Sequence, residues 1–310
     1  MSMRHAFVVL WLLVASLGLL SGCGDESDFD WDGEDWDSWD EDQAIAASSS
    51  LRVLSWNLRH EGWSGETNYA ADAAQIWNQF GASASSPNGC DLVFLQEVMY
   101  PEAAEGIAEE LEALSGVTWV AEVTPVIGRS TYKEAYAVLY RTDRADVEDW
   151  WVWNDVGDKF EREPMIVTVR DVRSGADFTF INWHTIFGST SERKAEITQI
   201  SKVFGTIQAG DTTDQDVILL GDHNAPATSS WWTPLTTLTP AVAWKLNEPT
   251  TLNSSGGYAS AYDHFWFQAS YLTEFSTAGR DYVANTQTFV TNLSDHVPIW
   301  MKLYSTADTD

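Results

Sequence analysis

The chain has 310 residues, of which 44% are hydrophobic and 13% aromatic, and its formal net charge at pH 7 is −29. This length and composition allow one large hydrophobic core within a single domain. The strongly acidic balance excludes a surface that attracts polyanions over its whole extent, so a nucleic-acid site would need a local group of cations or metal ions.

The N-terminal segment is typical of an export signal. Residues 1–22 carry Arg4 near the start and an apolar stretch over residues 6–20, which is too short to span a bilayer comfortably. The segment runs into Leu20-Ser21-Gly22-Cys23, which resembles the bacterial lipoprotein processing box, in which cleavage leaves the Cys as a lipidated N-terminus. An ordinary signal peptide that contains a Cys is the alternative. We expect an exported protein whose lipidated Cys23 anchors it to the cell envelope or cell surface without a membrane span. Release of the protein from that anchor is a further possibility.

An acidic stretch follows the signal. Residues 24–42 contain eleven Asp and Glu and no Lys or Arg, so like-charge repulsion should keep them extended and disordered. Asp28, Asp30 and Asp32 resemble the first half of a calcium loop, but Trp39 stands where such a loop needs a bidentate Glu. We favour a solvated tether over weak calcium binding. The chain therefore divides into a signal peptide (1–22), a lipidated Cys with a disordered tether (23–50), a folded domain (51–305) and a tail (306–310).

The domain itself remains acidic and has a single cysteine. Without Arg4 and the eleven acids of the tether, the 17 basic and 46 acidic residues of the chain leave 16 against 35, a net charge of −19. Cys90 has no partner in this part of the chain, so the domain must be stable without a disulfide. We expect Cys90 to be a buried apolar thiol just in front of a strand.

Strands and helices alternate from residue 51 onward, as judged from hydrophobic periodicity. Strands are predicted at residues 51–58, 91–98, 119–123, 135–141, 147–153, 165–172, 178–183, 217–220, 263–268 and 297–304. Helices are predicted at residues 69–80, 103–114 and 189–207, the last opened by a capping box at residues 189–192. The pattern predicts an α/β fold, a four-layer sandwich of two packed mixed sheets with helices outside.

Polar side chains recur at the strand ends. Asn57, Glu97 and His184 each end a predicted strand, Asp222 and Asn224 follow another, Asp263 begins one, and Asp295 and His296 precede the last. Each of these residues alone would be an ordinary surface or structural residue. Because strand ends at one edge of an α/β sheet lie together, the recurrence predicts that the side chains converge on one site.

Residues 216–226, DVILLGDHNAP, can be interpreted either as a strand followed by a simple turn or as a strand that ends in functional residues. Gly, Asn and Pro after a buried strand favour a simple turn with an Asx hydrogen bond. The alternative is a functional strand end, in which Asp222 and Asn224 lie two apart on a nearly extended chain and point to the same side. His223 then points away and packs, and we expect His60 and His264 to lie around the site without acting in it.

Four ordered motifs carry a resemblance to a known family. Trp56-Asn57-Leu58, Gln96-Glu97-Val98, Gly221-Asp222-x-Asn224 and Ser294-Asp295-His296 resemble the signatures of the endonuclease/exonuclease/phosphatase superfamily. Residues 128–134, GRSTYKE, and 162–164, REP, are similar to stretches of its deoxyribonuclease I-like branch, and Arg59 stands where that branch has an Arg. The resemblance covers residues 51–304 and implies the deoxyribonuclease I-like four-layer sandwich.

The resemblance implies a metal-dependent phosphodiester hydrolase. It assigns catalytic roles to Glu134, His184, Asp222, Asn224, Asp263 and His296, with His296 paired to Asp263 as the base and His184 paired to Glu134 as the acid. A carboxylate behind an imidazole fixes its tautomer and raises its basicity. Metal ligands would come from Asn57, Glu97, Asp222, Asn224 and Asp295, whose hard oxygens suit Mg²⁺ or Mn²⁺. Ca²⁺ is a further candidate as a structural or synergistic ion.

The same resemblance implies DNA as the substrate. Arg59, Arg129, Tyr132 and Arg162 would bind it through phosphates and a sugar. Met99 departs from the family, which has a minor-groove Arg there, so strand preference stays open. We expect a monomeric, exported DNA endonuclease without an obligate protein partner. The alternatives are a phosphodiesterase for phospholipid head groups or inositol phosphates, and a non-catalytic surface binding module.

Overall fold

The computed structural model describes residues 50–63, 68–79, 89–210, 215–281, 283 and 285–305. The signal segment, Cys23, the acidic tether and the tail lie outside these residues, so the lipid anchor and the domain boundaries stay predictions. Among the described helices, none is long and apolar enough to cross a membrane.

The first sheet is built around one parallel pair of strands. Its strands are β1 (Ser50–Glu61), β2 (Leu92–Val98), β3 (Trp119–Val123), β4 (Ala135–Arg141), β11 (Phe275–Arg280) and β12 (Ile299–Tyr304), in the order β11-β12-β1-β2-β4-β3. β1 and β2 are parallel, and every other pairing is antiparallel. The crossover between the parallel strands carries the helix α2 (Tyr69–Gln79). The helices α3 (Pro101–Ser115) and α6 (Thr286–Asn292) also belong to this half.

The second sheet repeats this plan. Its strands are β5 (Ala145–Val152), β6 (Met165–Asp171), β7 (Asp177–Asn182), β8 (Val217–Asp222), β9 (Ala243–Lys245) and β10 (Asp263–Phe267), in the order β5-β6-β7-β8-β10-β9. β7 and β8 are its parallel pair, and the crossover between them carries α4 (Thr190–Gly210). A 3-10 turn (Ser230–Trp232) and the short α5 (Thr233–Thr236) pack beside α4.

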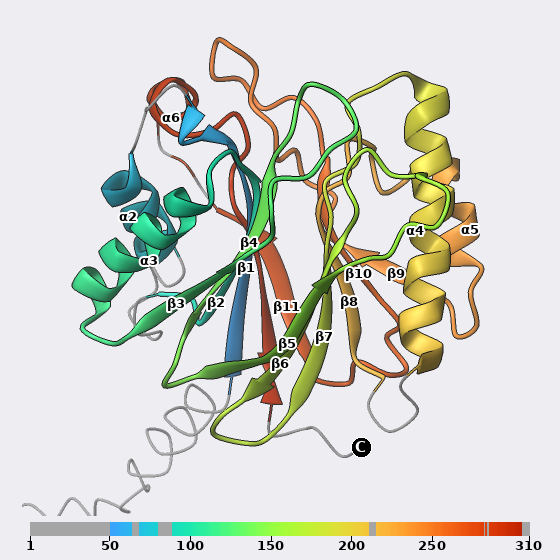
Figure 1. Ribbon diagram of the computed structural model, residues 1–310, viewed down its shortest axis with the longest axis horizontal. Helices are drawn as coiled ribbons and strands as arrows, with labels where there is room; N and C mark the ends of the chain where they lie inside the picture. Colours follow the sequence, from blue (N-terminus) through green and yellow to red (C-terminus); the bar gives the residue numbers. More distant parts are fainter. Residues whose placement is uncertain are drawn as a thin grey trace, which may run out of the picture. The chain divides into compact units, whose positions relative to one another are not determined.

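Four layers result because both faces of each sheet are apolar. Alternate residues of β1 and β2 divide between two cores: Val53 and Phe94 face the other sheet, whereas Leu54 and Leu95 face the helices. The layer between the sheets includes Phe94 packed on Phe180, with ring centroids 4.8 Å apart. Figure 1 shows the two sheets in the middle, α2 and α3 outside the first, and α4 outside the second. The predicted four-layer sandwich is confirmed.

Most predicted elements are present, and the elements that prediction missed lack an apolar pattern. β11 has the sequence FSTAGR and is half-exposed along almost its whole length, so hydrogen bonding to β12 and not burial defines it. α6 is capped by Asn285, whose side chain accepts a hydrogen bond from the amide of Thr288. α4 begins as predicted, because the Glu192 carboxylate accepts from the amide of Ser189 at 2.7 Å. Cys90 is a buried free thiol just before β2, as expected.

Candidate active site

The two parallel strand pairs bring the predicted site residues to one end of the sandwich. Asn57, Glu97 and Asp222 lie at the carboxyl ends of β1, β2 and β8, and His184 follows β7, while Glu134, Asp263 and His296 lie at or just before the start of antiparallel strands. An antiparallel strand begins where its neighbour ends, so both kinds of position fall at the same edge. Interstrand pairing continues past β7, since the amide of Thr185 donates to the carbonyl of Asp222 at 3.0 Å and holds His184 beside β8.

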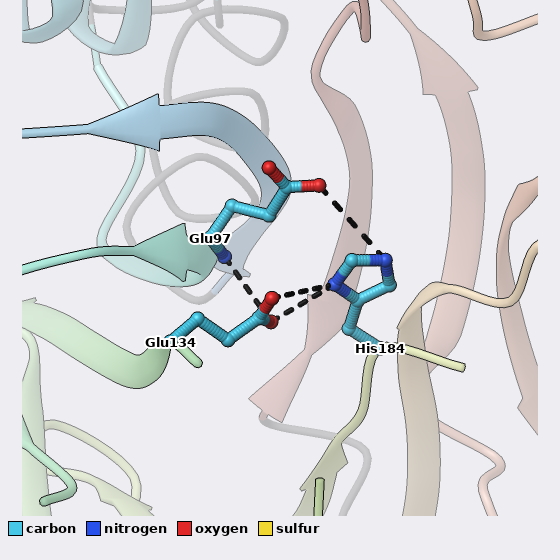
Figure 2. A group of neighbouring side chains, drawn as sticks. All are labelled: Glu97, Glu134 and His184. Carbon is cyan, nitrogen blue, oxygen red and sulfur yellow. Dashed lines mark hydrogen bonds and ion pairs between the residues drawn. The ribbon is translucent and has the colours of Figure 1, made fainter. Parts of the chain in front are cut away.

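His184 is held by a carboxylate on one side of its ring. Nδ1 lies 2.9 and 3.1 Å from the two carboxylate oxygens of Glu134, and Figure 2 shows this carboxylate facing one ring nitrogen while Glu97 faces the other. Arg162 lies behind Glu134, with Nε 3.5 Å from its Oε2. Burial lowers the pKa of His184, but Glu134 and Asp222 outweigh burial, and the net pKa is raised above the ordinary value. Glu134 therefore favours a proton on Nδ1 and turns Nε2 toward the site.

His296 has the same arrangement on the opposite side. Nδ1 lies 2.9 Å from Oδ2 of Asp263, and the hydroxyl of Thr250 donates to that same oxygen. Burial again lowers the pKa of the imidazole, but Asp263 and Asp222 raise it well above its ordinary value. The hydroxyl of Ser294 accepts from the amide of His296 and donates to the carbonyl of Asn57, which fixes the loop against β1.

Asp222 stands between the two imidazoles. Its Oδ2 lies 3.4 Å from Nε2 of His184 and 3.4 Å from Nε2 of His296, and it accepts from the amide group of Asn57 at 3.1 Å. Burial raises the pKa of Asp222 above its ordinary value, although the two histidines act in the opposite direction. The two carboxylate-backed imidazoles thus point their free nitrogens at one central carboxylate.

The segment after β8 forms an Asx turn and also places a polar side chain in the site, so both interpretations of its sequence apply. The amide of Asn224 donates to Oδ1 of Asp222 at 2.9 Å, which is an Asx turn, and Asn224 has a φ of 46°. The expectation of a nearly extended chain through Asn224 is therefore wrong. The turn still delivers the side chain, since Nδ2 of Asn224 lies 3.2 Å from Nε2 of His184. Gly221 is required here, because a Cβ would lie 2.2 Å from the carbonyl oxygen of Trp183.

Glu97 is the best-defined candidate cation ligand. The side chain of Asn57 donates to its Oε1 at 3.0 Å, the hydroxyl of Tyr132 donates to its Oε2 at 2.7 Å, and Nε2 of His60 lies 3.2 Å from Oε2. Burial would raise its pKa, but His184 and the Asn57 hydrogen bond lower it to about 2, so the carboxylate is ionised. A backbone φ of 56° at a register shift of β2 turns this side chain into the site.

The remaining predicted ligand is placed less directly. Asp295 is half-buried in the loop before β12, next to His296, and its carbonyl accepts from the amide of Leu252. Two groups of side chains bring potential ligand atoms within 4.8 Å of one another: Glu97, Glu134 and His184, and Asp222, Asp263 and His296. Carboxylates outnumber cationic groups in this region, so the donor set fits a hard divalent cation. Membership of Asp295 in that set stays a prediction.

The predicted substrate-binding cations are engaged within the protein. Arg59 donates to the carbonyl of Val290, and Arg129 donates to the carbonyl of Asp158 at 2.8 Å. Arg162 is only 3% exposed, and its guanidinium reaches Glu134 and the carbonyls that follow β7. Sequence reasoning therefore missed one part of its role, which is to hold Glu134 behind His184. Contacts of these three residues with substrate stay predictions.

His223 is a packing residue, as expected, since its ring lies against the rings of Trp183, Trp232 and His264. His223 and His264 are fully buried and stack on each other, with ring centroids 5.9 Å apart. Burial lowers the pKa of both imidazoles. Sequence reasoning also mapped no calcium position. Asp155, Asp158 and Glu163 bring carboxylate oxygens within 4.8 Å of one another in the loop after β5, a group that the sequence analysis did not single out.

Comparisons with known proteins agree with this geometry. The model of the endonuclease/exonuclease/phosphatase family matches residues 54–296. A deoxyribonuclease of Thioalkalivibrio sp. is 28% identical over 240 residues, which cover 76% of this chain and 62% of that protein. Deoxyribonuclease-1 of Equus caballus is 27% identical over 283 residues, which cover 84% of this chain and 94% of that protein.

Solved structures share the fold. An endonuclease/exonuclease/phosphatase family protein from Bacteroides thetaiotaomicron superposes with a TM-score of 0.59 at 19% identity, over 82% of this chain and 94% of that one. At this identity the likeness concerns the fold alone. The chain also spans less than two thirds of the length of the Thioalkalivibrio protein.

Proposed function

Because this chain belongs to the endonuclease/exonuclease/phosphatase family, on its deoxyribonuclease I-like branch, we propose that it is an exported, metal-dependent endonuclease that hydrolyses DNA. The observation that carries the proposal is the pair of carboxylate-backed imidazoles whose Nε2 atoms lie 3.4 Å from one oxygen of Asp222. Hydrolysis of a phosphodiester needs one group that removes a proton from water and another that protonates the leaving oxygen.

The two histidines divide this proton work. Each holds a proton on Nδ1 against its own carboxylate, so Nε2 is the atom that accepts or donates during the reaction. Following the resemblance, His296 accepts the proton of the attacking water, and His184 donates a proton to the leaving oxygen. Asp222 lies between them, where it can orient the water, and the amide group of Asn224 reaches the same space as a hydrogen-bond donor.

A divalent cation completes the proposed chemistry. Glu97, which stays ionised, and Asp295 would hold Mg²⁺ or Mn²⁺ beside Asn57. The observation in favour is the donor set itself, in which ionised and neutral oxygens gather without any thiolate among the described residues. When bound, the cation neutralises negative charge on the phosphate oxygens. Asn57 keeps Glu97 and Asp222 at fixed positions, since its one amide nitrogen donates to both.

DNA is the proposed substrate because both reported deoxyribonuclease relatives are named for it. Export, the lipid anchor at Cys23 and a monomeric state complete the proposal and rest on the sequence alone. A role in degrading extracellular DNA for phosphate and nucleosides would suit that location. Hydrolysis of phospholipid head groups or inositol phosphates is the competing function on the same catalytic groups.

The test is nicking of supercoiled plasmid by the purified full-length protein, with and without Mg²⁺, beside His296→Ala. We expect metal-dependent nicking that the variant loses, with a melting temperature that shows the variant to be folded. Phosphatidylinositol vesicles are the parallel substrate. Intact plasmid together with release of the head group would replace the nuclease proposal with the phosphodiesterase alternative.

A further inference from the structure

Three aromatic rings form a partly exposed group at the edge of the candidate active site. The ring of His60 stands edgewise to Trp63 at a centroid distance of 4.8 Å and to Tyr132 at 5.1 Å, while Trp63 and Tyr132 lie 6.1 Å apart. We call these three residues the aromatic shelf. Trp63 is 47% exposed, so part of its indole is open to a ligand beside the candidate site.

The shelf is tied to the catalytic groups through one carboxylate. The hydroxyl of Tyr132 and Nε2 of His60 both contact Oε2 of Glu97, at 2.7 and 3.2 Å, while Oε1 of the same carboxylate accepts from Asn57. A group that packs against Trp63 therefore lies beside His60 and Tyr132, which contact Glu97 of the candidate active site directly. The shelf is a neighbour of the reaction and takes no part in proton transfer.

A groove extends from the shelf along the surface. Its volume is about 950 Å³, and its walls include Arg59, His60 and Trp63 on one side and Asn285, Thr288 and Asn292 of the α6 region on the other. This is room enough for a nucleotide. The walls combine apolar groups, among them the indole of Trp63 and the side chain of Phe289, with polar side chains, so the groove fits a ligand that has one flat apolar face and hydrogen-bonding edges.

Electrostatics cannot supply most of the affinity here. The guanidinium groups of Arg59, Arg129 and Arg162 already have carbonyl or carboxylate partners in the protein. The domain as a whole carries a net charge of −19, from 16 basic and 35 acidic residues. Few phosphate contacts mean little counterion release, and binding must then draw on an interaction that does not depend on salt. Stacking of a base on an aromatic ring is such an interaction.

We propose that Trp63, supported by His60 and Tyr132, is a stacking site for an unpaired nucleobase next to the scissile phosphate. This inference rests on the proposed nuclease function and deepens it, because it names single-stranded DNA as the preferred substrate. In a duplex both faces of a base are covered by its neighbours, and a base must leave the stack before an indole can cover it. A single strand offers its bases at no such cost. Trp63 is then a specificity determinant and not a catalytic residue.

The experiment compares Trp63→Ala with the wild type on one oligonucleotide, supplied as a single strand and as a duplex. We expect KM for the single strand to rise roughly tenfold or more with kcat nearly unchanged, and KM for the duplex to stay the same. Trp63→Phe should restore most of the loss, since it returns a stacking ring. Trp244→Ala removes another exposed Trp, on the edge strand β9 of the other sheet, and is the matched control.

Salt gives a second readout. KM of the wild-type enzyme for the single strand should change little between about 50 and about 200 mM salt, whereas a site built on many phosphate contacts would weaken steeply. An equal loss on single strand and duplex in Trp63→Ala would overturn the inference, since Trp63 would then only support the fold of the β1 end. A wild-type enzyme that cuts neither form would refute the nuclease function itself, and the inference with it.

Discussion

Replacement of Asp263 by Asn isolates the charge behind His296. The hydroxyl of Thr250 donates to Oδ2 of Asp263, so in the variant it would hold the amide with its oxygen in that position, 2.9 Å from Nδ1 of His296. The ring should therefore keep its orientation while the negative charge disappears. Asp222 remains 3.4 Å from Nε2, and the imidazole keeps one of its two carboxylate neighbours.

The expected loss follows from this partial removal. A positioned general base contributes about 10²–10⁴-fold to the rate, and an imidazole that has lost its carboxylate is a poorer base. We expect kcat on DNA to fall about 10²–10³-fold, or about 3–4 kcal/mol in activation free energy. The assay is steady-state cleavage at saturating DNA, with the melting temperature measured in parallel. Asp281→Asn is the matched control, because it is the same change at a buried carboxylate outside the site. A kcat within about threefold of wild type for Asp263→Asn would refute the assignment of His296 and Asp263 as a catalytic pair.

Four further outcomes can be measured. Chelation of divalent metal should abolish cleavage and added Mg²⁺ should restore it, and activity that persists in chelator would contradict the cation site. His184→Ala should lower kcat by about 10²-fold or more in a folded protein, and near-normal turnover would remove it from the mechanism. Burial raises the pKa of Asp281 from its ordinary 3.8 to about 8, so wild-type stability should fall as pH rises from about 4 to about 8, because the unfolded chain ionises first. Asp281→Asn should flatten this dependence and be more stable by a few kcal/mol at about pH 8, with no such gain near about pH 4; equal stability curves would contradict the shift. Cys23→Ser should move the protein out of the membrane fraction, and unchanged fractionation would contradict lipidation.

The grouping of the candidate site residues could be predicted from sequence because strand ends carry a strong local signal. Asn57, Glu97 and Asp222 each follow a buried apolar run, and parallel strands bring such ends to one edge of a sheet. The pairing of two sheets with helices outside follows from the same runs, since residues on both faces of these three strands are apolar. The apolar runs and the polar residues that follow them are local in the sequence, so both can be read without knowledge of the fold.

Other features depend on contacts between distant segments and left no such signal. Thr250 holds Asp263, and Ser294 holds the carbonyl of Asn57, but both are ordinary hydroxyl residues in loops. Arg162 was assigned to the substrate, yet the fold places its side chain behind Glu134 at 3% exposure. β11 could not be found either, because its residues are half-exposed and only the ladder with β12 makes it a strand.

The strand order also determines how much of the chain must be synthesised before the candidate site is complete. β12, the last strand of the described chain, pairs with β1, the first, and His296 lies just before it. A nascent chain that has emerged only as far as α6 therefore lacks both the proposed base and the strand that closes the first sheet. If the protein is the nuclease that we propose, a nascent chain of that length cannot cleave DNA while it is still on the ribosome. A cell that synthesises such an enzyme beside its own chromosome would be protected during translation by topology alone, without an inhibitor.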